Sequence, residues 1–99
     1  MATFKINNSF YLPRRGLMVI AGEILSGEVR VGMALRKQIN SEFSLAPPID
    51  AIEFARTDRG EDVCLCYKVD HATPEDVEFI QLLFPSGHSY EVVELDAQT

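Results

Sequence analysis

The sequence predicts an all-β fold, a closed or nearly closed antiparallel β-barrel that occupies residues 1–99 as a single domain. Three observations predict it. β-Branched and aromatic residues recur in short runs, and turn-forming residues separate those runs. The pattern gives seven or eight strands and no helix of ordinary length. A chain of 99 residues can also bury enough surface for one modest core.

The first half of the chain supplies four of the expected strands. They lie over residues 4–11, 17–25, 28–31 and 33–39. Turn signals separate them, with Pro-Arg-Arg-Gly at 13–16 and Ser-Gly at 26–27. Gly22 falls inside the second strand, where a glycine predicts a bulge or a bend at a barrel corner.

The second half of the chain begins with a polar loop over residues 40–48, which ends in two prolines. Further strands are expected over 49–54, 63–69, 79–84 and 89–95. Within 63–69, the period of two places Leu65 and Tyr67 on one apolar face and Cys64 and Cys66 on the other. A single helical turn is expected at 73–76, because Thr-Pro-Glu-Asp supplies a capping hydroxyl, a first-turn proline and an acid.

The net charge of −6 is unevenly distributed along the chain. Residues 1–49 carry six basic against three acidic side chains, and residues 50–99 carry three basic against twelve acidic ones. An acidic chain is a poor binder of bulk nucleic acid, because neutralised phosphates supply most of that affinity. The basic first half leaves a local contact with nucleic acid open.

Membrane and secretory classes are disfavoured. The longest apolar run, Leu17 to Ala21, is much shorter than the about 20 residues that span a bilayer. The first residues lack the apolar segment of a secretory signal. We therefore expect a cytoplasmic protein that does not associate with membranes.

The cysteines are expected to be reduced. Cys64 and Cys66 lie two apart on an extended strand, where a disulfide would be strained, and cytoplasmic disulfides are scarce. The chain's soft metal ligands are Cys64, Cys66, His71 and His88. They lack the spaced pairs of a structural zinc site, so we expect no metal.

Two further patterns resemble sites of known chemistry, and both are incomplete. Gly27 and Gly32 have the spacing of a phosphate-binding loop, but the lysine and hydroxyl residue that should follow are absent. Ser86 lies near His88 without the tight turn that surrounds a nucleophilic serine. We expect no catalytic residues, no cofactor and no enzymatic activity.

The run from Arg15 to Leu35 resembles the opening of domain 2 of elongation factor Tu and related translation GTPases. Gly22, Gly27 and Gly32 keep the five-residue glycine spacing of that family. Ile-Glu-Phe at 52–54 and Gly-Glu-Asp-Val at 60–63 agree with a second block of the family. The resemblance covers most of residues 4–95, and it implies a translation-protein barrel without the GTPase domain.

In the family, this barrel docks on the GTPase domain and holds the aminoacylated 3′ end of transfer RNA. The positions that match the end-binding region are Glu53, Arg56 and Asp62. Arg14, Arg15 and Arg30 could add contacts to phosphates, with solvated turns as the alternative for the first two.

Three hypotheses follow for the function. The leading one is a non-enzymatic interaction module that binds a protein partner or a second copy of itself. The second is binding of an RNA end, and the third is a small-molecule-binding or enzymatic barrel, since related barrels occur in flavin reductases.

Overall fold

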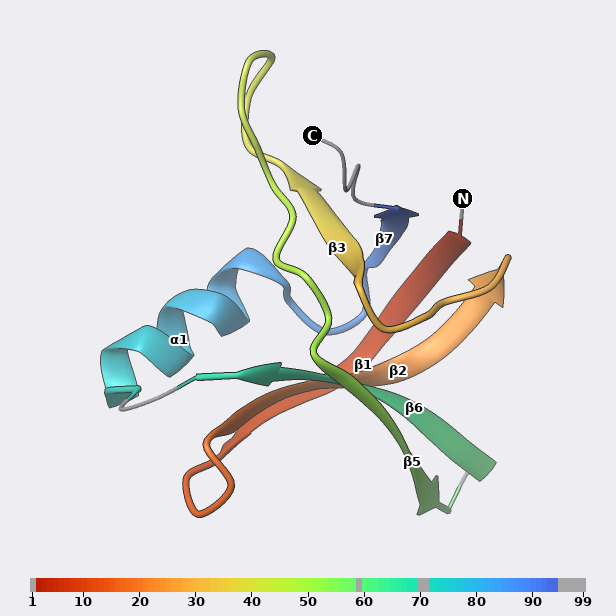
Figure 1. Cartoon of the computed structure of the whole chain (residues 1–99), viewed down its shortest axis with the longest axis vertical. Coiled ribbons are helices and arrows are strands. Elements are labelled where there is room, and N and C mark those ends of the chain that lie inside the picture. Colours follow the sequence, from red (N-terminus) through yellow and green to blue (C-terminus); the bar gives the residue numbers. More distant parts are fainter. Residues whose placement is uncertain (1, 59, 70–71, 95–99) are drawn as a thin grey trace.

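The computed structural model describes residues 2–58, 60–69 and 72–94, and these form an antiparallel sheet with one helix (Figure 1). The strands are β1 (Ala2–Leu12), β2 (Leu17–Ser26), β3 (Met33–Gln38), β4 (Ser44–Leu45), β5 (Ala51–Thr57), β6 (Gly60–Lys68) and β7 (Ser89–Glu94). The helix, α1, spans Pro74–Leu83 and connects β6 to β7. The all-β prediction is therefore confirmed at the level of the sheet.

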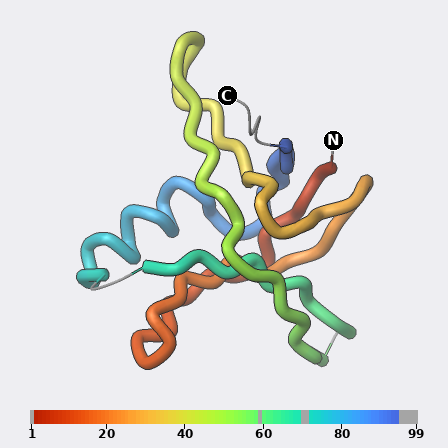
Figure 2. The backbone as a smooth tube through the Cα atoms, viewed as in Figure 1, coloured from red at the N-terminus to blue at the C-terminus, as the bar shows by residue number. Residues whose placement is uncertain are grey.

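The strand order is β4-β3-β7-β1-β2-β6-β5, and every pairing is antiparallel. The sheet is not closed into a barrel, so the closed form expected from the sequence is wrong. A short segment also connects β3 directly to β6: Ile49 donates to the Met33 carbonyl at 2.8 Å, and Asp50 donates to the Cys66 carbonyl at 2.9 Å. Pro48 still forms a bridge with Ala34, but Pro47 and Pro48 have no N–H group to donate, which limits how far this pairing continues toward β4. Figure 2 shows the segment passing from the β3–β4 hairpin to β5.

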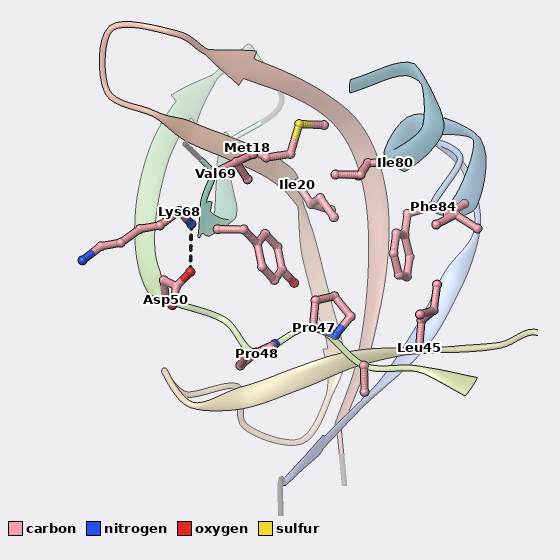
Figure 3. A pocket seen from close by; sticks show the side chains of 13 residues that line it. Met18, Ile20, Leu45, Pro47, Pro48, Asp50, Lys68, Val69, Ile80 and Phe84 are labelled. Carbon is pink, nitrogen blue, oxygen red and sulfur yellow. Dashed lines mark hydrogen bonds between the residues drawn. The ribbon is translucent and has the colours of Figure 1, made fainter. Parts of the chain in front are cut away.

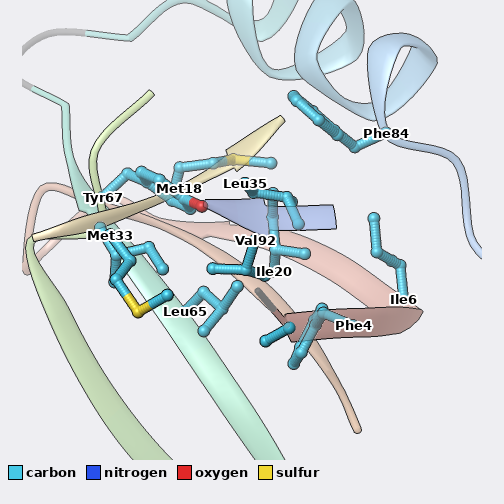
Figure 4. Close-up of a cluster of buried hydrophobic side chains, with 12 residues drawn as sticks. Phe4, Ile6, Met18, Ile20, Met33, Leu35, Leu65, Tyr67, Phe84 and Val92 are labelled. Atoms are coloured by element: carbon cyan, nitrogen blue, oxygen red, sulfur yellow. The ribbon is translucent and has the colours of Figure 1, made fainter. Parts of the chain in front are cut away.

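The core lies on one face of the curved sheet (Figure 4). Its fully buried side chains come from five strands and from the segment before β5. They include Phe4, Ile6, Met18, Ile20, Leu35, Ile49, Leu65 and Val92. A smaller cluster on the opposite face contains Leu17, Val19, Ala21, Cys64 and Cys66. This division confirms the two faces predicted for residues 63–69.

The bulge predicted at Gly22 is present between β1 and β2. The register shifts between Ile6, which pairs with Gly22, and Asn8, which pairs with Ala21. A Cβ atom on Gly22 would lie 1.9 Å from the Lys5 carbonyl oxygen. The absence of a side chain is what lets the two backbones approach at this bend.

The strand predicted over 79–84 is wrong, because most of these residues belong to α1. A capping box starts the helix: the Asp76 N–H donates to Thr73 Oγ1 at 3.1 Å, and the Thr73 N–H donates to Asp76 Oδ2 at 3.0 Å. Val77, Ile80 and Leu83 then recur every three residues and pack together against the core. This spacing suits one face of a helix, which outweighs the short apolar run that resembled a strand.

The strand predicted over 28–31 is also wrong. Residues 28–32 form an irregular turn, in which the Met33 N–H donates to the Arg30 carbonyl at 3.1 Å. Gly32 has a positive φ of 95° there, a conformation that favours glycine and ends an extended segment.

Candidate functional site

A pocket of about 600 Å³ opens between α1, β2, the end of β6 and the segment 45–50 (Figure 3). Its volume falls within the range of pockets that hold small molecules, about 300–1,000 Å³. The wall is mostly apolar, with side chains that include Met18, Ile20, Pro47, Ile80, Leu83 and Phe84. Polar atoms come from Tyr67, Asp50 and Lys68.

The helical wall is fixed to the sheet near its C-terminal end. The Gln81 side-chain amide donates to the Ser9 carbonyl on β1 at 3.0 Å. The ring of Phe84 is buried and meets Tyr90 of β7 edge to face, with ring centres 5.4 Å apart. These contacts position α1 so that its half-buried Ile80 and Leu83 form part of the pocket wall.

Tyr67 supplies the most unusual group in this site. Its side chain lies in the core beside Met18 and Ile20, with 8% of the residue exposed. Its hydroxyl is buried and makes no hydrogen bond with the described part of the protein. Burial raises the pKa of the phenol well above its ordinary value, and the nearby negative charge of Asp50 adds to this shift. The hydroxyl therefore stays protonated and can act as a hydrogen-bond donor at neutral pH.

The charged groups of the pocket wall are Asp50 and Lys68. The Lys68 backbone N–H donates to Asp50 Oδ2 at 2.8 Å, and this bond orients the carboxylate at the end of β6. Figure 3 shows the Lys68 side chain extending away from the apolar wall. Asp50 is therefore the charged side chain of the wall whose position a hydrogen bond fixes.

Two of the residues predicted to bind RNA meet each other outside the pocket. The guanidinium of Arg15 donates to both carboxylate oxygens of Glu53, at 2.6 and 3.3 Å. This hydrogen bonding, together with the charge of Arg15, holds the pKa of the Glu53 carboxyl below its ordinary value. The pair links the β1–β2 turn to β5.

Of the other predicted site residues, Arg56 and Asp62 lie in the paired strands β5 and β6, whereas Arg14 and Arg30 lie in separate turns. Arg30 pairs with Glu28 and Glu94, at 3.3 and 2.8 Å. Arg14 is exposed in the β1–β2 turn, and Arg56 is exposed on β5. Asp62 on β6 accepts a hydrogen bond from the Asn7 side chain at 3.4 Å. None of the six predicted residues lines the pocket.

Over residues 2–58, 60–69 and 72–94, no group of three histidine, cysteine or acidic side chains is arranged to hold a metal ion. His71 lies outside the described residues, and His88 is exposed. Cys64 and Cys66 are free thiols, and burial raises the pKa of each. Within the same part of the chain, no helix has the length and apolar character needed to cross a membrane.

Comparisons of the chain with protein-family models, with curated proteins and with solved structures find no match. The site therefore has to be interpreted from its own geometry and chemistry.

Sequence reasoning missed this pocket for a specific reason. The sequence predicts a strand over residues 79–84 and a polar loop over residues 40–48, and neither prediction places a pocket wall there. The signal for the first wall was present in the Thr73–Asp76 capping box and in the three-residue spacing of apolar side chains after it. The second wall carries no comparable signal, because Pro47 and Pro48 are placed by contacts distant in sequence.

Proposed function

We propose that the protein is a non-enzymatic binding module, and that its pocket holds a small, mainly apolar molecule. The proposal rests on an apolar cavity of about 600 Å³ whose wall includes Tyr67, a residue with a buried hydroxyl that has no hydrogen-bond partner in the described residues. Such a cavity with few polar groups is the usual form of a small-molecule site. Of the three hypotheses from the sequence, the binding of a small molecule is the one that this observation supports most.

Binding without catalysis is the simplest use of these groups. The pocket brings together one neutral phenol and one carboxylate, and the sequence shows no nucleophile with a matching base. The barrel type of the translation factors also stays a proposal. Positive φ values at Gly27 and Gly32 and the close approach at Gly22 agree with the glycine pattern on which it rests.

The test is binding of a neutral, environment-sensitive dye such as Nile red. We expect dye fluorescence to increase and shift to the blue with wild-type protein. Ile80→Glu places a charge in the apolar wall and should weaken binding by at least about tenfold, since an unpaired charge is costly there.

Leu82→Glu provides the matched control on the same helix. Leu82 is 78% exposed and does not line the pocket described above, so this variant should bind the dye like the wild type. Equal loss in both variants, or equal binding by both, would show that the dye does not enter this pocket.

A protein partner, the leading expectation from the sequence, is the second candidate. It is favoured by Phe54, which is 65% exposed on the outermost strand β5, and by Phe79, which is 60% exposed on α1. An outermost strand also presents backbone groups that can pair with another chain. Sedimentation equilibrium tests its self-association form, and a monomer over the whole accessible concentration range would rule that form out.

A further inference from the structure

The pocket contains two polar groups whose positions restrict what it can hold. Tyr67 places a hydroxyl inside the core, and Asp50 places a carboxylate where β6 ends. The rest of the wall is almost entirely apolar. These two groups therefore decide which polar atoms a bound molecule can carry and where.

The Tyr67 hydroxyl acts as a donor and needs an acceptor. It is buried, and a buried hydroxyl without a partner is unfavourable until it gains one. Because the oxygen itself is covered, a ligand reaches it only when a wall side chain moves aside. Residues 46 and 47 line the pocket and lie in no helix or strand, so we assign this movement to them.

The charges around the pocket are mainly negative. Asp50 is in the wall, and the Lys68 ammonium extends away from it (Figure 3). The helix that forms one wall adds Glu75, Asp76 and Glu78, which are exposed and do not line the pocket, and it has no basic residue between Pro74 and Leu83. A ligand with a negative charge would therefore be repelled at the rim.

Resting on the binding function proposed above, we infer that the ligand is an apolar molecule with a hydrogen-bond acceptor for Tyr67 and without a negative charge. A ketone, ester, ether or amide with a hydrocarbon body has this chemistry. A fatty acid does not, although its hydrocarbon chain would suit the wall equally well.

Three probes of matched chain length separate the contributions of the hydrocarbon body, the hydrogen-bond acceptor and the negative charge to binding. They are decane, methyl octyl ketone and decanoate. Each is used to displace Nile red from the wild-type protein. We expect the ketone to compete about three- to tenfold better than decane, which is the usual effect of one hydrogen bond. Decanoate should compete on the order of fivefold less well than the ketone, owing to the charge of Asp50.

Two conservative variants assign these differences to the two residues. Tyr67→Phe keeps the ring and should make the ketone no better than decane. Asp50→Asn keeps an oxygen that can accept from the Lys68 N–H, and it should improve decanoate while leaving the ketone unchanged. Circular dichroism verifies that both variants fold. If Tyr67→Phe does not fold, the comparison of the ketone with decane in the wild-type protein still tests whether the ligand gains from a hydrogen-bond acceptor.

The outcomes distinguish this inference from the function on which it rests. If Nile red and all three probes fail to bind, the proposed function is wrong and the inference falls with it. If the dye and decane bind but the ketone gains nothing over decane, or decanoate binds best, the pocket binds molecules and only the inference is overturned.

Discussion

Replacing Tyr67 with phenylalanine should stabilise the unliganded protein. In most proteins the removal of a buried tyrosine hydroxyl has the opposite effect. The reason for the expected stabilisation is that this hydroxyl is removed from water without gaining a hydrogen bond in the described residues. Leaving such a group unsatisfied costs about 1–3 kcal/mol, and Tyr67→Phe removes that cost while it keeps the ring in the core. We expect the free energy of unfolding to rise by about 1 kcal/mol.

Thermal unfolding followed by circular dichroism measures this change. A gain of about 1 kcal/mol raises Tm by roughly 4–8 °C for a domain of this size. Tyr11→Phe is the control, because Tyr11 also packs against the core without having a buried, unpaired hydroxyl. A fall in Tm for Tyr67→Phe would refute the reasoning, since it would mean that the hydroxyl has a partner, such as a buried water molecule.

Two further predictions follow from the core and the sheet. Burial raises the pKa of Tyr67, so the unfolded chain loses the phenol proton first, and stability should fall above about pH 10 by up to ~1.4 kcal/mol per pH unit. Urea unfolding across this pH range should show a smaller fall in the free energy of unfolding for Tyr67→Phe than for the wild type. The remaining fall in the variant comes from the two buried cysteines. An equal dependence on pH in both proteins would contradict the burial of the phenol. Gly22→Ala should lower the free energy of unfolding by about 3 kcal/mol or more, because its Cβ would lie 1.9 Å from the Lys5 carbonyl oxygen. In Gly32→Ala the added Cβ meets nothing within 4 Å and strains only a positive φ, so the free energy of unfolding should fall by less, about 1–2 kcal/mol. If urea unfolding gives equal losses for the two variants, the bend between β1 and β2 at Gly22 is not tight.

Local patterns were sufficient to predict most of the sheet. The alternation in residues 63–69 predicted β6 and both of its faces, because Leu65 and Tyr67 belong to the main core and Cys64 and Cys66 to the smaller cluster on the other face. The bulge at Gly22 was also predictable, since a glycine inside an apolar strand often marks a bulge or a close approach of two backbones. These features depend on residues close together in the sequence.

The features that were missed depend on competition between patterns or on distant contacts. In residues 79–84 an apolar run resembled a strand, but the capping box and the packing of Ile80 and Leu83 on the core favour a helix. Closure of the barrel could not be decided locally, since it depends on how far Pro48 and Ile49 can pair with β3. The pocket lies between α1 and the segment that contains Pro47 and Pro48. Its prediction would have required the correct structure for both.

An NMR titration of methyl-labelled protein with methyl octyl ketone would show whether the pocket between α1 and β2 binds a ligand. We expect saturable shifts at the methyl groups of Met18, Ile20, Ile80 and Leu83, which line the pocket, and none at the exposed Leu82. Shifts that are absent, or that appear at Leu82 and over the whole surface alike, would contradict the claim that this pocket is a binding site.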